Sequence, residues 1–463
     1  MKCSMNFFCS LVEMLRSRWA IRLALLVPAL FGSRAVQAAP QPNIVFILAD
    51  DMGYGDVSKY YCTDYVTTNI DRIANEGVML TQAYAWPVCS PSRAALLTGM
   101  DPKRAGVPAV LMSGAAGINT NTYTIAEHLK RNGYATGAIG KWHLGYTGNA
   151  LPQARGFDTF FGFHGGEVNY TNFWYTSGAE YDLWDGDVNV AADYQGQYAT
   201  QLWTEKAKAF INAHTNQPFF LYLAYNAPHY PLYAPTNYTA MYTGIPYGNR
   251  RTFAAMVRVM DDGIGEILNL LAAKGLSSNT IVWFMTDNGP MTGQGGVALP
   301  LKGEKYVVTE GGIRLPSMVK WPGRIPAGTT SDVPFRICDV YPTLCAAVGE
   351  SVPSSLRLDG TNMIDVLTGN SSAASRTLTF FNNGTYADRA VVDGDWKMIN
   401  TTGTAEIYNL ASDLAETTDL SGSESARIPA LEQAASNQWI SIAKGLYDTN
   451  QPPDIMKFRG PSL

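Results

Sequence analysis

The sequence lacks three features, and each absence excludes a class of protein. Its main candidate for a membrane span, Leu23–Gly32, is shorter than the roughly 18 residues that such a helix needs. Six cysteines in 463 residues are too few for a disulfide framework. The formal net charge of −5 gives no general attraction to nucleic acid. What remains is a globular chain with 46% apolar residues, long enough for a large core and two or three domains.

Residues 1–38 have the pattern of a signal peptide. Three arginines precede the apolar run Leu23–Gly32, and small residues at Val36 and Ala38 offer a cleavage point. We expect cleavage near Ala38 and export to the periplasm or the exterior, with no stable membrane anchor afterwards. An uncleaved anchor is the alternative, but the run is too short to span a membrane. Because the segment holds five cations and one acid, its loss would shift the net charge to about −9.

Cleavage would also leave four cysteines, Cys62, Cys89, Cys338 and Cys345. Cys338 and Cys345 are seven residues apart in a segment of helical character, which places them two turns apart and too far for a bridge. No disulfide on which the fold depends is expected.

Apolar runs that alternate with helical segments predict an α/β sheet with helices on both faces. The strand candidates are Asn43–Ala49, Phe219–Ala224 and Thr280–Met285, with a weaker one at Ala135–Ile139. The helix candidates are Thr124–Asn132, which opens with a capping box, Thr200–His214 and Arg251–Lys274.

The composition changes after residue 370. Asn370–Ser375 is typical of a linker. The segments after it are strand-like at Thr377–Phe381, Ala390–Val392 and Trp396–Asn400, and helical at Pro429–Lys444. We therefore expect a main domain of residues 39–370 and a smaller C-terminal α+β subdomain of residues 371–463.

Carboxylates, a lysine and histidines follow the four strand candidates. In order along the chain they are Asp50-Asp51, Lys141 with His143, His229, and Asp287-Asn288. Ligand sites in open α/β sheets lie beyond the carboxyl ends of the strands, so we expect these side chains to meet at one edge.

Asp50, Asp51, Asp287 and Asn288 offer only oxygen ligands. Such a set suits a hard cation, Ca²⁺ first and Mg²⁺ second. Either pair alone would more often be an ordinary loop at a strand end. Two such pairs, each after an apolar strand, favour a metal site.

The run from Cys89 to Gly99 predicts a helix with a nucleophile at its start. Ser90 is the expected N-cap, Pro91 the first helical residue and Gly99 the stop. Cys89 would then lie just before a helix N-terminus, where free N–H groups and the dipole favour an anion. Arg93 would lie about one turn in, on a face that can point back toward Cys89.

Two histidines stand beside other candidate groups. His143 is two residues from Lys141, so the two share a face if the segment is extended, and His229 lies in a rigid proline-flanked turn. His128 and His214 lie on helical segments, which predicts surface or core positions for them, and His164 could line a pocket.

The run from Cys89 to Gly99 matches the pattern Cys-x-Pro-x-Arg with its trailing Leu-Leu-Thr-Gly, and Gly133–His143 resembles a second motif of the same family. On these motifs the chain resembles the type I, formylglycine-dependent sulfatases of the alkaline phosphatase-like superfamily. The resemblance runs from Asn43 to about Pro316, and weakly onward. It implies a large mixed, mainly parallel sheet sandwiched by helices.

The resemblance also implies roles for the site residues. Cys89 would be oxidised by a formylglycine-generating maturation enzyme to formylglycine (3-oxoalanine), whose hydrate is the nucleophile. By motif match, His143 would be the base for the hydrate, Arg93 would hold the formylglycine, His229 would be the acid for the leaving oxygen, and Lys141 and Lys305 would bind sulfate oxygens. Residue 89 would join Asp50, Asp51, Asp287 and Asn288 as a ligand of Ca²⁺.

Lys305 is assigned by counting back from Glu310 in the family pattern Gly-Gly-Lys-Gly-x-x-x-Glu-Gly-Gly-x-Arg. This chain has Glu304 and Tyr306 where the pattern has small residues. Lys302 is the reserve candidate for the same position.

The expected activity is hydrolysis of an aryl or carbohydrate sulfate ester. A phosphate or phosphonate monoester hydrolase of the same superfamily is one alternative. A non-catalytic binder of sulfated glycans is another, if Cys89 stays unmodified. The aromatic stretch Gly162–Trp184 carries no basic residue apart from His164, which favours a small or singly sulfated ester over a densely sulfated polymer. Ordinary packing is an equal explanation for its aromatic residues.

Overall fold

A computed structural model describes residues 41–370 and 376–445. In that part of the chain, eleven strands form one mixed sheet in the order β12-β2-β11-β10-β1-β9-β3-β4-β7-β8, with β13 also paired to β2. Their bounds are β1 Asn43–Ala49, β2 Val78–Tyr84, β3 Ala135–Lys141, β4 Thr159–Phe163, β7 Trp184–Asp185, β8 Val188–Asn189, β9 Phe219–Ala224, β10 Thr280–Thr286, β11 Arg314–Lys320, β12 Thr329–Ser331 and β13 Phe335–Arg336. A hairpin of β5 Trp174–Tyr175 and β6 Glu180–Tyr181 stands apart.

The centre of the sheet is parallel. Strands β10, β1, β9, β3 and β4 pair side by side in that order, whereas β11 and β7 run antiparallel to their neighbours β10 and β4. All four strands expected from the sequence belong to this parallel core, so the prediction of a mixed, mainly parallel sheet is confirmed.

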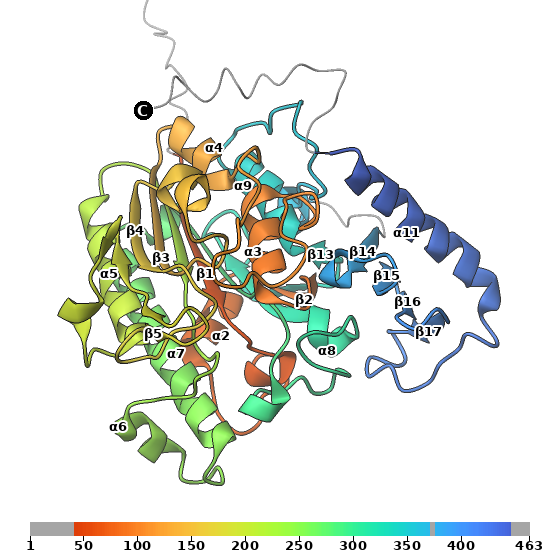
Figure 1. Cartoon of the computed structure of the whole chain (residues 1–463), viewed down its shortest axis with the longest axis horizontal. Coiled ribbons are helices and arrows are strands. Elements are labelled where there is room, and N and C mark those ends of the chain that lie inside the picture. Colours follow the sequence, from red (N-terminus) through yellow and green to blue (C-terminus); the bar gives the residue numbers. More distant parts are fainter. Residues whose placement is uncertain (1–40, 371–375, 446–463) are drawn as a thin grey trace, which may run out of the picture. The chain divides into compact units, whose positions relative to one another are not determined.

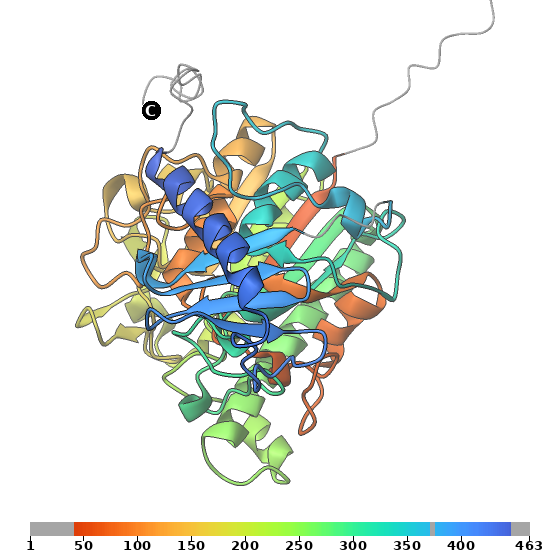
Figure 2. The same cartoon turned by 90° about the vertical axis from the view of Figure 1, so that its right-hand side faces the viewer.

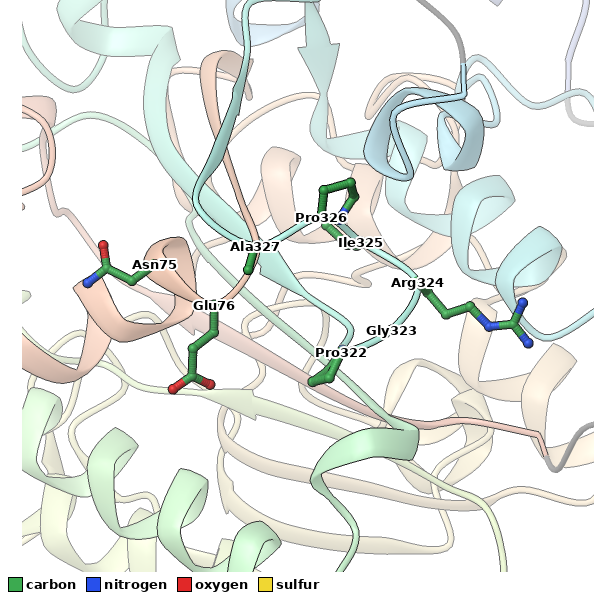
Figure 3. Close-up of a pocket in the computed structure, with 8 residues that line it drawn as sticks. All are labelled: Asn75, Glu76, Pro322, Gly323, Arg324, Ile325, Pro326 and Ala327. Carbon is green, nitrogen blue, oxygen red and sulfur yellow. The ribbon is translucent and has the colours of Figure 1, made fainter.

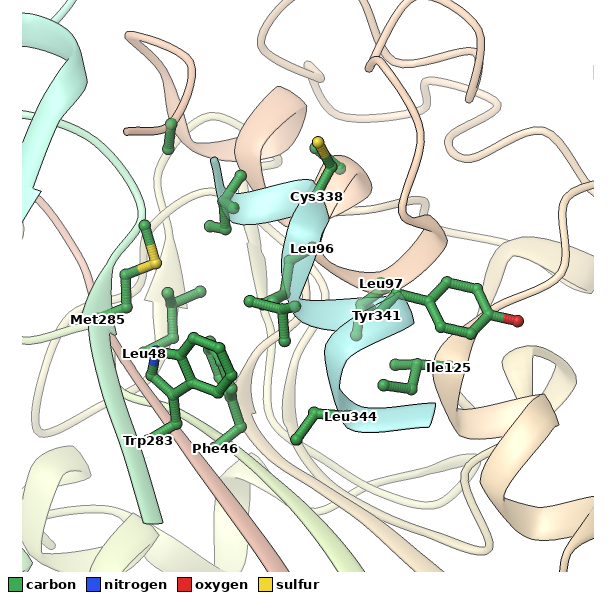
Figure 4. Packing of buried hydrophobic residues seen from close by; sticks show 14 of the residues in the cluster. Phe46, Leu48, Leu96, Leu97, Ile125, Trp283, Met285, Cys338, Tyr341 and Leu344 are labelled. Atoms are coloured by element: carbon green, nitrogen blue, oxygen red, sulfur yellow. The ribbon is translucent and has the colours of Figure 1, made fainter. Parts of the chain in front are cut away.

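The buried side chains of each central strand alternate between two cores. On β1, Ile44, Phe46 and Leu48 face one core while Val45, Ile47 and Ala49 face the other. Figure 4 shows part of the first core, where Phe46 and Trp283 of the sheet pack near Leu96, Tyr341 and Leu344 of the helices above it. Strands buried on both faces explain why the sequence reads as continuous apolar runs rather than as an alternating pattern.

Helices cover both faces of the sheet (Figure 1). One core receives α3, α4 and α9, and the other receives α2, α5 and α7. The bounds are α2 Thr68–Asn75, α3 Cys89–Thr98, α4 Ile125–Arg131, α5 Ala199–Ala213, α6 Thr236–Thr239, α7 Asn249–Ala273, α8 Glu310–Ile313, α9 Val340–Ala347 and α10 Ile364–Leu367. The expected capping box of α4 is present: the Thr124 hydroxyl accepts from the Glu127 N–H at 3.1 Å, and the Glu127 carboxylate accepts from the Thr124 N–H at 2.8 Å.

A second, antiparallel sheet follows residue 376. Its strands, in order, are β14 Thr377–Phe381, β15 Arg389–Asp393, β16 Trp396–Asn400 and β17 Glu406–Asn409. Helix α11, Ile428–Ala443, lies across one face of this sheet (Figure 2). The other face, through side chains such as Phe380 and Val392, continues the core below α3 and α9. The predicted C-terminal α+β element is therefore present, while the domain boundary at residue 370 stays a prediction.

Some expectations fall outside the described residues. These are the signal peptide 1–38 with its two cysteines, and residues 371–375 of the expected linker. Cys62, Cys89, Cys338 and Cys345 are all free thiols. None of the helices in the described ranges is long and apolar enough to cross a membrane.

His128 of α4 is buried as a neutral imidazole between Tyr123 and Tyr341. Burial, assisted by the charge of Arg131, lowers its pKa from 6.5 to about 4. As the pH falls from 6.5 toward 4, the unfolded chain takes up a proton that the folded chain does not. His128 should therefore cost stability in that window, by up to about 1.4 kcal/mol per pH unit. In H128F, the unfolding free energy measured with denaturant from pH 4 to 7 should fall less steeply toward pH 4 than it does in wild type. Parallel curves for H128F and wild type would contradict the assignment.

Candidate active site

The polar groups that follow the central strands meet at one edge of the sheet. Asp50 and Asp51 directly follow β1, Lys141 ends β3, and Asp287 and Asn288 follow β10. Asn288 Nδ2 donates to Asp51 Oδ1 at 2.7 Å, and Lys141 Nζ donates to Asp50 Oδ2 at 2.6 Å. The convergence expected from the strand ends is thus present.

Helix α3 begins two residues earlier than the sequence suggested. Val88 is in the extended N-cap conformation and Cys89 is the first helical residue, so the expectation that Ser90 caps the helix is wrong. The Ser90 hydroxyl instead accepts from the Leu111 N–H at 3.1 Å. Pro91 still lies in the first turn. The N–H groups of a first turn have no partner within the helix, so the lack of an N–H in proline costs no hydrogen bond there. Gly99 ends the helix at φ 69°, as expected.

Cys89 and His143 face each other across the site. Cys89 Sγ lies 3.3 Å from His143 Nδ1, and His143 Nε2 lies 2.9 Å from the Leu111 carbonyl oxygen. A carbonyl can only accept, so Nε2 carries the proton and the Nδ1 lone pair points at residue 89. Burial, followed by the charge of Lys141, holds the pKa of His143 well below its usual range.

Lys141 and His143 would share a face only if the segment between them were extended. The backbone at His143 is not extended, so the two side chains point to different partners. His143 has φ 54°, so Lys141 reaches Asp50 while the imidazole turns to Cys89. A Cβ on Gly166 would stand 2.9 Å from the His143 ring, so this neighbour must be glycine for the ring to fit.

Arg93 is fully buried behind Cys89. Its guanidinium donates to Asp287 Oδ2 at 2.8 and 3.0 Å, and to the Lys141 carbonyl at 3.0 Å. Its other charged neighbour is Asp50 Oδ2 at 3.6 Å. Arg93 therefore joins the ends of α3, β3 and β10.

Lys305 and His229 approach Asp51 from two further loops. Lys305 Nζ donates to Asp51 Oδ1 at 2.7 Å, and His229 Nε2 lies 3.5 Å from Asp51 Oδ2. His229 Nδ1 donates to the Tyr230 carbonyl at 2.6 Å, which leaves Nε2 directed at the site. Lys302 lies elsewhere, with its ammonium donating to the Glu416 carbonyl at 3.1 Å. The geometry favours Lys305 over Lys302.

Two buried oxygens of the site lack a hydrogen-bond partner in the described chain, Asp50 Oδ1 and Asn288 Oδ1. An unpaired buried oxygen is costly unless a cation or water compensates it, so these residues fit a hard metal ion. Asp50, Asp51 and His229 also have ligand atoms within 4.8 Å of one another. Asp287, which the sequence also suggested, now binds Arg93 through Oδ2.

The carboxylates carry opposite pKa shifts. Burial raises the pKa of Asp50, but the charges of Lys141, His229 and Arg93 outweigh it and hold the pKa below its usual range. Burial and the nearby charge of Asp50 raise the pKa of Asp287 to about 7. Burial also raises the pKa of the Cys89 thiol, so the encoded thiol stays protonated at neutral pH.

A cavity of about 130 Å³ opens onto these groups. Its lining includes Cys89, His143, His229 and Lys305, together with residues that the sequence did not assign to the site: Val110, Leu111, Met112, Gly166, Glu167, Tyr175, Ser177 and Tyr306. Gly166, Glu167, Tyr175 and Ser177 fall within the aromatic stretch Gly162–Trp184 that the sequence had left open between packing and substrate contact, and Tyr306 adjoins Lys305. Val110, Leu111 and Met112 lie in a segment that no sequence motif marks. His164 is not among them; its ring stacks between Phe160 and Trp184.

A larger cavity of about 580 Å³ lies by the end of α2 (Figure 3). Its lining is Asn75, Glu76 and residues 322–327, and Figure 3 shows Glu76 and Arg324 pointing away from each other. Glu76 is already paired with Lys320 at 2.5 Å. This cavity holds none of the converging groups.

Comparison with known proteins agrees with the geometry. A family model described as Sulfatase matches residues 42–350. The chain is 37% identical to arylsulfatase J of Mus musculus over 328 residues, which cover 69% of this chain and 54% of that protein. It is 36% identical to N-acetylgalactosamine-6-sulfatase of Rattus norvegicus over 380 residues, 74% of this chain and 69% of that protein. The chain thus spans about half to two thirds of these relatives.

Solved structures extend the similarity over more of the chain. The structure of Ps i-CgsB in complex with k-i-k-neocarrahexaose superposes with a TM-score of 0.82 at 33% identity, covering 91% of this chain and all of that one. The two sheets of the structure and the family match over residues 42–350 lead to the same assignment. The chain belongs to the sulfatase family and has the alkaline phosphatase-like fold.

Proposed function

We propose that this protein hydrolyses a sulfate ester, with residue 89 as nucleophile after its conversion to formylglycine. The observation that carries the proposal is the pairing of Cys89 Sγ with the unprotonated Nδ1 of His143 at 3.3 Å, beside Lys305 and His229 on one cavity. The buried, protonated thiol is a poor nucleophile as encoded, which favours a modified residue.

The side chains supply the remaining functions. His143 Nδ1 is placed to take a proton from a hydroxyl on residue 89. His229 Nε2 lies 3.5 Å from Asp51 Oδ2. Because Nδ1 donates to the Tyr230 carbonyl, Nε2 would give a proton to the leaving oxygen when the imidazole is protonated on both nitrogens. Lys141 and Lys305, now bound to carboxylates, are the cations nearest the metal candidates and are suited to hold sulfate oxygens.

Residue 89, Asp50, Asp51, Asp287 and Asn288 would hold Ca²⁺, or Mg²⁺ in its place. The three carboxylates cancel the charges of Arg93, Lys141 and Lys305, so a bound divalent ion would leave the site positive toward sulfate. When bound, the ion supplies electrostatic stabilisation of the developing negative charge, and formylglycine supplies a hydrated aldehyde as nucleophile.

The deciding experiment joins mass spectrometry of the Cys89 peptide with steady-state rates. Protein from its native host should carry an aldehyde at residue 89, and kcat/KM should be higher for an aryl sulfate than for the matched aryl phosphate. Faster phosphate turnover would favour a phosphate or phosphonate hydrolase. An unmodified Cys89 with no turnover would favour a non-catalytic binder of sulfated glycans.

Removal of the metal should lower stability as well as activity. After treatment with EDTA, adding Ca²⁺ at 100 times its Kd should raise the unfolding free energy by about 2.7 kcal/mol, because the ion binds the folded site alone. A thermal shift assay with Ca²⁺ and Mg²⁺ measures this, and D51N should lose most of the Ca²⁺ response. An identical Tm with and without Ca²⁺ would contradict the metal site.

We also propose that residues 1–38 direct export and are then removed, and that a formylglycine-generating enzyme acts on the chain. The Arg-flanked apolar run Leu23–Gly32 and the motif beginning at Cys89 support these two proposals. The substrate would be a small-molecule or carbohydrate sulfate ester, and nucleic acid is not expected as a partner.

A further inference from the structure

Tyr306 stands at the mouth of the active-site cavity in a conformation that disfavours its side chain. Its φ is 79°, in the left-handed region, and 52% of the residue is exposed. Its N–H donates to the Pro87 carbonyl and its own carbonyl accepts from Asn382 Nδ2, both at 2.8 Å. These bonds hold the peptide in a geometry that glycine would adopt without strain.

The sulfatase motif has a small residue at this position, so the ring of Tyr306 is a departure that the backbone does not need. Burial does not account for it, because half of the residue is exposed. Strain retained at a functional cavity points to a use for the side chain.

The ring lies beside the cation assigned to sulfate. Lys305 Nζ is 5.6 Å from the centre of the Tyr306 ring, and both residues line the cavity. The alcohol part of a sulfate ester is bonded to the sulfate, so it must occupy the space next to that cation. A flat ring there offers an apolar face to a sugar or aryl group.

Glu167 and Ser177 supply the polar part of the lining. The Ser177 hydroxyl donates to Glu167 Oε1 at 2.9 Å, while Oε2 has no hydrogen-bond partner in the described ranges. A carboxylate only accepts, so Glu167 suits the donating hydroxyls of a saccharide.

The charge of the lining sets a limit on the substrate. Lys305 is the one lysine or arginine among the described residues that line the cavity. A second sulfate on the same sugar ring would meet the Glu167 carboxylate rather than a cation.

We propose that Tyr306 and Glu167 form the leaving-group subsite of this enzyme, for a saccharide ring that carries a single sulfate. Tyr306 packs against the ring, and Glu167 binds its free hydroxyls and rejects a second sulfate. This inference rests on the proposed function and names the substrate class of that site.

The test compares Y306G and E167Q with wild type on hexose monosulfates and on the same hexoses carrying two sulfates. Y306G relieves the backbone strain, so it should fold at least as stably as wild type. It should raise KM for a hexose monosulfate about tenfold or more, the loss of roughly one good contact. Its inhibition constant for inorganic sulfate should not change, because sulfate alone does not fill the subsite. E167Q should reduce the preference for the monosulfate over the disulfate about tenfold.

Tyr247, which is 92% exposed and outside this cavity, gives a matched control: Y247G should leave KM unchanged. An unchanged KM in Y306G, with normal turnover of 4-nitrophenyl sulfate by wild type, would overturn the subsite and leave the proposed function intact. If fully converted wild-type protein hydrolyses no sulfate ester at all, the proposed function fails, and the subsite with it.

Discussion

The C89A variant should lose sulfate-ester hydrolysis by roughly 10⁴-fold or more, because removing a covalent nucleophile leaves only binding and electrostatic effects. In the structure the His143 lone pair points at residue 89, which is the one cysteine among the described residues that line the cavity. The measurement is kcat/KM on an aryl sulfate, with the converted fraction of wild type determined by mass spectrometry.

Cys345 provides the control for C89A. It is equally buried, in α9, and belongs to the hydrophobic core rather than to the cavity. C345A should cost about 1 kcal/mol of stability and leave kcat/KM unchanged. If C89A kept a tenth of the wild-type rate while C345A behaved normally, residue 89 would not be the nucleophile.

The parallel core was predictable because strands that are buried on both faces have continuous apolar sequences. Asn43–Ala49 and Phe219–Ala224 were predicted with the bounds that the structure gives. Strand β11 gave no such signal: it begins with Arg314, ends with Lys320 and contains Pro316. The proline is tolerated at a register shift between Leu315 and Ser317, where a strand hydrogen bond is absent in any case.

The site was predictable where its residues follow strands or form a motif, as Asp50 and Lys141 do. The cavity wall was not, because Met112, Glu167 and Tyr306 lie on loops whose approach depends on the tertiary fold. The start of α3 was misplaced for a related reason. A serine before a proline resembles an N-cap, but the Ser90 hydroxyl is used by the neighbouring Leu111 loop.

The K397M variant should lose about 3–5 kcal/mol of unfolding free energy. Lys397 of β16 is completely buried, with its ammonium 2.8 Å from both Glu310 and Glu416. Glu416 also accepts from the Glu310 N–H at 2.7 Å. Removing the shared cation leaves two buried carboxylates facing each other, and breaking a buried ion pair from one side typically costs this much. Urea unfolding at pH 7 measures the loss.

The pH dependence distinguishes lost charge pairing from lost packing. Burial raises the pKa of Glu310, but Lys397 and Arg314 outweigh it and hold the pKa below its usual range. The stability that this pairing contributes is present above the ordinary glutamate pKa and is lost as the pH falls through the lowered value. Without Lys397 the carboxyls would take up protons on folding. The difference in unfolding free energy between K397M and wild type should therefore narrow toward pH 4.

The control is K208M. The partly exposed ammonium of Lys208 pairs with Glu205 and Glu266, so its removal should lower the unfolding free energy by less than about 1 kcal/mol. Because Glu310 begins α8, directly after the segment that carries Lys305 and Tyr306, K397M should also lower kcat/KM at pH 7. A gap that does not change with pH would assign the loss to packing of the lysine stem alone.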